Sequence, residues 1–335
     1  MVFICPVVGL SLKDHPDRCF TVQRVTFIER RHFFEDPTAF GIKTEFFSNL
    51  STDEIYSKVF ANAPTVALLR GSRKKSDPAT ASYRKIKEEI DILSMSRLGL
   101  QKRRFAGYMG FAGEYSTQHL EHFIFGDDGS LSYGGQAQRL PFPLNLDEHW
   151  MAACQQKFFF EFLDILTQKK LVASKWRETL RRAAILIGKS ANTNDLALAF
   201  LWNMIAFELL LTQQGDSYAS VLPARAKAFV GWLAQWDTEN WEDRLESLYR
   251  LRCQFVHDGN SANVQVDDLL FMDNLVMGIF GNIIKAIDIF PNKEAVINFA
   301  SKVKAEELLQ LEDKLRPNSF AFWSLVYDDE DRKSI

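Results

Sequence analysis

An arginine and a histidine lie five positions apart in the stretch LYRLRCQFVHDGN, which runs from Leu248 to Asn260. Arginine offers a fixed charge and paired donors to phosphate oxygens, and histidine can accept or release a proton near neutral pH. Arg252 and His257 could therefore hold a phosphate group and move a proton. Each residue also has a structural explanation, because an arginine can pair with a buried acid and a histidine suits a helix C-terminus.

The helix that must position Arg252 is expected to begin near Asn240, with acidic residues in its first turn. Trp241, Leu245 and Leu248 mark its buried stripe at helical spacing, and the next position on that stripe is Arg252. Removing an arginine from water is costly unless it has a partner. The side chain therefore needs an acid, a phosphate group or the groove of a neighbouring subunit.

An acid for Arg252 is present within the chain. Glu208 interrupts the apolar helix expected over Leu196 to Leu211 and is a charge where a hydrophobic residue is expected. An ion pair of Glu208 with Arg252, or with Arg225, would satisfy both charges.

The direction of the His257 side chain depends on where the helix ends. Five positions turn an ideal helix by about 140°, so Arg252 and His257 act together only if the helix ends or bends between them. Asp258-Gly259 supplies an ending, because glycine adopts the left-handed conformation of a helix C-cap. We expect His257 to turn toward the site that Arg252 faces, whether that site holds an acid, a phosphate group or the groove of a neighbouring subunit.

Taken in order, these segments resemble HEPN domains, and most closely the ApeA-like branch. Arg252-x4-His257 at a helix end is similar to the R-x4-6-H signature of the family. Glu208-Leu209-Leu210-Leu211 is similar to the preceding E-x-L-L helix, and Ala224-Arg225-Ala226 to the start of the next helix. The resemblance covers Trp176 to Phe290. In many active members the residue after the arginine is polar, and here it is Cys253.

The resemblance implies a metal-independent endoribonuclease that cleaves RNA where two copies of the motif face each other in a homodimer. Arg252 and His257 would be catalytic, and Glu208, Arg225, Cys253 and Asp258 would support them, without a cofactor. The family implies a cytoplasmic protein of a prokaryotic anti-phage defence or toxin system, with a phage-derived trigger or a neutralising partner. Two alternatives remain: a non-catalytic scaffold that binds nucleotide or RNA or holds a dimer, and an N-terminal enzyme with a helical dimerisation module.

The chain predicts two domains and a tail. Residues 1–145 alternate short β-type runs with turns, including a hairpin turn at Asp127-Asp128-Gly129, and contain one helix ending at Gly99, which predicts an α+β domain of sensor or regulatory type. Residues 149–315 predict an all-α, HEPN-like bundle, and 316–335 a frayed acidic tail. The expected helices are His149–Lys170, Ser174–Lys189, Asn194–Gln213, Pro223–Trp236, Asn240–Val256, Asp267–Phe290 and Asn292–Lys314.

Composition narrows the functional classes. A net charge of -3 and a pI near 6.1 exclude nucleic-acid binding by bulk charge alone, which leaves local basic clusters such as Arg70–Lys75 and Gln101–Arg104 as backbone contacts or solvated loops. Four cysteines without a CxxC pair favour reduced thiols over a disulfide framework or a zinc ribbon. The apolar run 196–211 is shorter than the roughly 20 residues of a membrane-spanning helix. We therefore expect no membrane segment and no metal site.

Overall fold

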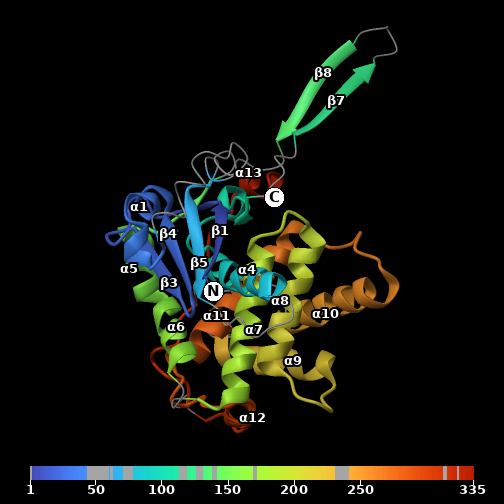
Figure 1. Ribbon diagram of the computed structural model, residues 1–335. Helices are drawn as coiled ribbons and strands as arrows, with labels where there is room; N and C mark the ends of the chain where they lie inside the picture. Colours follow the sequence, from blue (N-terminus) through green and yellow to red (C-terminus); the bar gives the residue numbers. More distant parts are fainter. Residues whose placement is uncertain are drawn as a thin grey trace. The chain divides into compact units, whose positions relative to one another are not determined.

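The computed structural model describes residues 2–43, 60, 63–70, 78–112, 119–125, 131–137, 142–168, 172–230, 241–311, 315–322 and 324–335. It divides into two compact units, which are Met1–Lys87 with Arg104–Glu148, and Glu88–Arg103 with His149–Ile335. The first unit holds the principal β-sheet and the second is helical (Figure 1), which confirms the predicted fold class of an α+β region followed by an all-α bundle. Among the helices in these ranges, none has the length and apolar character needed to cross a bilayer.

The sheet unit is built on five antiparallel strands in the order β3-β4-β5-β1-β6. Their buried faces meet short helical segments, and Ile28, Phe33, Val66 and Leu68 lie in one core cluster. Outside this sheet, β2 pairs with β9 in parallel, and β7 pairs with β8 in antiparallel fashion. The predicted turn at Asp127-Asp128-Gly129 lies outside the described residues, although the strands on either side of it do pair. The elements of this unit are β1 (Val2–Val8), β2 (Leu10–Ser11), β3 (Cys19–Val22), β4 (Val25–Glu29), α1 (Arg30–Glu35), η1 (Pro37–Phe40), β5 (Thr65–Arg70), β6 (Gly110–Phe111), β7 (His119–Phe125), β8 (Leu131–Ala137) and β9 (Leu144–Asn145).

The division between the units falls within helix α4 (Pro78–Met95). Ile86, Ile90 and Leu93 are buried at helical spacing, as their sequence pattern predicts. Tyr83, three residues before Ile86, is 46% exposed and packs edge-on against Phe3. After α4 the chain continues to η2 (Arg103–Phe105). The segment Glu88–Arg103 belongs to the helical unit, although it precedes the other helices of that unit by about 50 residues.

The helical unit is organised around α11, in which nearly every residue from Leu269 to Ile284 is buried. A helix that is apolar around its whole circumference belongs at the centre of a bundle. The predicted single helix His149–Lys170 is instead two helices that break at Phe158, and the predicted continuation of α9 to Trp236 lies outside the described residues. The helices are α5 (Glu148–Lys157), α6 (Phe159–Thr167), α7 (Ser174–Ala191), α8 (Leu196–Leu211), α9 (Tyr218–Val230), α10 (Trp241–Asp258), α11 (Val266–Lys285), α12 (Lys293–Leu308) and α13 (Asp329–Lys333).

A buried ionic network lies on one side of α11. The Arg103 side chain is 1% exposed and donates through Nε and Nη2 to the two carboxylate oxygens of Asp273, at 2.5 and 2.6 Å. The same guanidinium donates to the backbone and side-chain oxygens of Ser190, both at 2.8 Å, and the Asn203 amide donates to Asp273. All of these groups come from the helical unit, so Arg103 serves as a polar centre for its packing.

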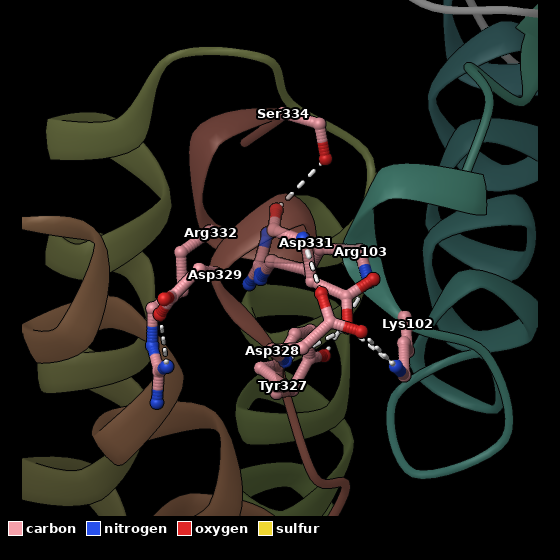
Figure 2. A network of polar contacts seen from close by, with 8 residues as sticks. All are labelled: Lys102, Arg103, Tyr327, Asp328, Asp329, Asp331, Arg332 and Ser334. Atoms are coloured by element: carbon pink, nitrogen blue, oxygen red, sulfur yellow. Dashed lines mark hydrogen bonds and ion pairs between the residues drawn. The ribbon is translucent and has the colours of Figure 1, made fainter.

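The C-terminal segment packs beside this network, as Figure 2 shows. Asp331 is fully buried, accepts from the Lys102 ammonium and exchanges hydrogen bonds with Asp328 at the start of α13. The Tyr327 hydroxyl accepts from the Arg103 backbone N–H at 3.4 Å, and burial, together with Asp273, raises the pKa of Tyr327 to about 12. The acidic tail is therefore anchored, in contrast to the predicted frayed end, because its carboxylates have basic partners.

Candidate functional site

Arg252 lies in the penultimate turn of α10 and pairs with Glu208 of α8. Its Nε is 2.9 Å from Glu208 Oε1, and its Nη2 donates to Oε2 at 3.0 Å. The pair joins the two charges that interrupt otherwise apolar helix faces, so the in-chain explanation of Arg252 is confirmed. The side of its guanidinium that carries Nε and Nη2 is directed into its own bundle.

Glu208 is the buried member of the pair. It lies near the end of α8, whose other buried residues are mostly apolar. Burial raises the pKa of the Glu208 carboxyl, and the charge and hydrogen bond of Arg252 oppose that rise. Arg252 thus favours the charged form of the carboxyl against its burial, and Glu208 orients the guanidinium.

Arg225 is not part of this pair. It lies on α9 and donates to both carboxylate oxygens of Asp216 and to the backbone oxygen of Leu211, which ends α8. The hydrogen bond from Arg225 lowers the pKa of Asp216. The alternative pairing of Glu208 with Arg225 is therefore wrong, and Arg225 instead fixes the connection between α8 and α9.

His257 lies within the helix and not beyond its end. Helix α10 continues to Asp258, and Gly259 follows in the left-handed conformation with φ +67° and its N–H bonded to Phe255 O at 3.1 Å. The glycine cap is as predicted, but it comes after both motif residues. Because α10 is unbroken between Arg252 and His257, their side chains leave its axis about 140° apart. The prediction that His257 turns toward the site of Arg252 within one protomer is wrong.

Two of the predicted supporting residues, Cys253 and Asp258, lie with His257 in the last two turns of α10. Cys253 is half-buried, whereas His257 and Asp258 are exposed. Burial raises the pKa of the Tyr249 hydroxyl, and a hydrogen bond with Cys253 adds to this rise. The Arg252 guanidinium lies 6.0 Å from the Tyr249 ring centre, so Tyr249 is a neighbour that sequence reasoning missed. Its position three residues before Arg252 is the signal that could have identified it.

The end of α10 presents an exposed surface with one apolar side chain. Val256 is 47% exposed, and Gln254, His257 and Asp258 around it are exposed as well. Arg252 engages Glu208 through Nε and Nη2, which leaves the Nη1 donors without a hydrogen-bonding partner among the described residues. Within one protomer, the Nη1 donors of Arg252 and the ring of His257 are therefore separate groups on different sides of α10.

In the Gln101–Arg104 cluster, two basic residues differ from both of their expected roles. Arg103 is buried in the network with Asp273, and Lys102 pairs with Asp331. Neither is a solvated loop residue or available to nucleic acid. In the Arg70–Lys75 cluster, Arg70 donates to the backbone oxygen of Phe40, and residues 71–75 lie outside the described residues.

Comparisons with protein-family models, with curated proteins and with solved structures found no match for this chain.

Proposed function

We propose that the protein is a metal-independent endoribonuclease that acts as a homodimer, in the cytoplasm of a prokaryote, as part of an anti-phage defence or toxin system. The observation that carries this proposal is the end of α10. There Glu208 orients the Arg252 guanidinium, whose Nη1 donors have no partner in the described part of the chain, and His257 is exposed on the same two turns. The R-x4-H pattern and its resemblance to HEPN domains support the same assignment.

The proposed chemistry divides the reaction between the two residue types. RNA cleavage requires deprotonation of the ribose 2′-hydroxyl, stabilisation of the charged phosphorane and protonation of the leaving 5′-oxygen. His257 would exchange these protons, and the Nη1 donors of Arg252 would bind the phosphorane oxygens. Because the two side chains diverge by about 140° within one helix, we propose that His257 of one protomer works with Arg252 of the other. A homodimer would supply one base and one acid from two copies of the motif.

A cleavage assay on purified protein tests this function directly. Labelled tRNA, mRNA and rRNA are incubated with the wild type and with His257→Ala and Arg252→Lys, with and without extract from phage-infected cells. We expect both variants to lose cleavage by at least about 100-fold, since acid–base catalysis contributes 10²–10⁴-fold and lysine cannot reproduce the guanidinium fork. His149→Ala and Arg250→Lys are matched controls, because both residues are exposed and lie outside the motif.

A wild-type dimer that leaves all three RNAs intact in both conditions would contradict the proposal. So would cleavage that survives in both motif variants.

A non-catalytic scaffold is the second candidate, and one observation favours it. Glu208 already neutralises Arg252, so the motif could serve to fix α10 against α8 and to present Val256 to a second copy. Val256→Asp distinguishes the candidates through sedimentation and cleavage measured together. An endoribonuclease loses its dimer and its cleavage in parallel, whereas a scaffold loses only the dimer because it never cleaved RNA.

A further inference from the structure

A second polar site lies in the helical unit, in a pocket of about 850 Å³ formed by α7, α8, the start of α9 and the start of α12. This volume is within the range of small-molecule sites. Its lining combines apolar side chains with hydroxyl, amide and charged groups, among them Ile205, Leu209, Tyr218, Lys293 and Ile297. Arg252 and His257 do not line it.

Lys293 is the unusual group in this pocket. Its ammonium donates to the backbone oxygen of Leu209 and lies 5.8 Å from the ring centre of Trp176. No carboxylate of the described residues lies within ion-pairing distance of it. An ammonium has three donors, so the pocket contains a half-buried cation with unused hydrogen-bonding capacity. Burial, with a contribution from the charge of Arg225, lowers the pKa of Lys293 to about 8, and Asp216 opposes this effect.

The other charged groups around Lys293 do not neutralise it. Glu208 is engaged by Arg252, and Asp216 by Arg225. Lys175 and Glu294 are exposed at the rim, with opposite charges. An anion that reached Lys293 would therefore gain a charge-assisted hydrogen bond without displacing an existing carboxylate.

We propose that this pocket binds a small phosphate-bearing aromatic molecule of the size of a nucleoside monophosphate, with its phosphate on Lys293. The aromatic part lies against Tyr218, which is half-exposed at the pocket, and against the apolar side chains Ile205, Leu209 and Ile297. The proposed binding groups lie outside the R-x4-H motif, although Glu208, the ion-pair partner of Arg252, also lines the pocket.

Isothermal titration calorimetry of the full chain at pH 7 tests this site, with AMP, GMP, CMP, UMP, inorganic phosphate and adenosine as probes. We expect at least one mononucleotide to bind with a Kd below 1 mM, and both inorganic phosphate and adenosine to bind at least tenfold more weakly. Lys293→Met should weaken the mononucleotide at least tenfold. Lys302→Met is the matched control, since Lys302 is exposed on the same helix, and it should change nothing.

Proton uptake gives a second measurement that a folding defect would not imitate. An anion bound to Lys293 raises its pKa, so binding at pH 8 must take up protons, and the observed enthalpy must differ between HEPES and Tris buffers. Lys293→Arg retains a charge at every pH, so it should bind with no buffer dependence from this residue. Absence of mononucleotide binding at 5 mM, unchanged affinity in Lys293→Met, or equal proton uptake in wild type and Lys293→Arg would each overturn the proposal.

Discussion

Two arginines of the helical unit pair with carboxylates on neighbouring helices, and they differ in how completely they are enclosed. Arg103 is 1% exposed and uses both Asp273 and Ser190 as acceptors. The side chain of Arg252 is 18% exposed and uses Glu208 alone. One guanidinium has its donors distributed over an enclosed network, whereas the other retains donors at an exposed helix end.

The difference separates a structural ion pair from a candidate functional one. Arg103 is buried with four of its five N–H donors engaged, so it has little to offer a ligand, although its charge type suits phosphate as well as that of Arg252 does. Arg252 is held firmly on one side and remains open on the other. Its partial enclosure, and not its charge, is therefore the feature that makes it a candidate for chemistry.

The largest expected effect comes from breaking the ion pair of Arg103 with Asp273, here called the enclosed pair. Asp273→Ala leaves the Arg103 charge buried without its carboxylate, so we expect the free energy of unfolding to fall by about 3–5 kcal/mol. Urea denaturation followed by circular dichroism measures this change. Asp267→Ala on the same helix is the control, because Asp267 is exposed and pairs with a partly exposed Arg332. A loss in Asp273→Ala no greater than in Asp267→Ala would contradict the structural role.

A smaller loss of stability is expected from breaking the ion pair of Arg252 with Glu208, here called the open pair. Arg252→Ala removes the partner of a buried Glu208, and we expect a loss of about 1–3 kcal/mol, since solvent can reach part of this site. The double variant Glu208→Gln with Arg252→Ala should recover part of that loss, as the uncompensated charge is gone. Urea denaturation of the single and double variants checks both values. If Arg252→Ala destabilises the protein as much as Asp273→Ala does, the two pairs are equivalent and the distinction fails.

The smallest expected effect concerns how the free energy of unfolding depends on pH through Tyr327, which lies beside Arg103 of the enclosed pair. The pKa of Tyr327 is raised to about 12, so the unfolded state loses this proton first, and stability falls as the pH rises through 10 toward 12. Tyr327→Phe has no proton to lose there, so its free energy of unfolding should fall less between pH 9 and pH 11. Urea denaturation at both pH values measures the slopes. Equal slopes in wild type and variant would show that Tyr327 is not enclosed as described.

The open pair was within reach of sequence reasoning, and the enclosed pair was not. Glu208 and Arg252 each interrupt an apolar helical stripe, so their types and spacing indicated a shared partner. Asp273 carries the same signal in the middle of α11, but its partner Arg103 is 170 positions away in a segment of basic residues that resembles a surface loop. Long-range pairing between dissimilar segments depends on tertiary packing, which local patterns do not encode.

The course of α10 shows another limit. Asp258-Gly259 correctly indicated a left-handed cap, but a two-residue signal cannot place a helix end to within one turn. The exact end of α10 decides whether His257 lies inside or outside the helix. Because His257 lies inside, its side chain would need a second protomer to act together with an Arg252 side chain. For the tail, acidic composition suggested a solvated end because the basic partner at Lys102 was not recognised.

The anchored C-terminal segment also sets an order of events during protein synthesis. Phe320 packs with Phe229, Phe290 and Phe299, and Asp331 pairs with Lys102, which the ribosome makes 229 residues earlier. The helical unit therefore cannot complete its core until Asp331 has emerged, whereas the strands of the sheet unit are all available once Asn145 has been made. Arg103 and Lys102 therefore lack their carboxylate partners until Asp273 and Asp331 have been made.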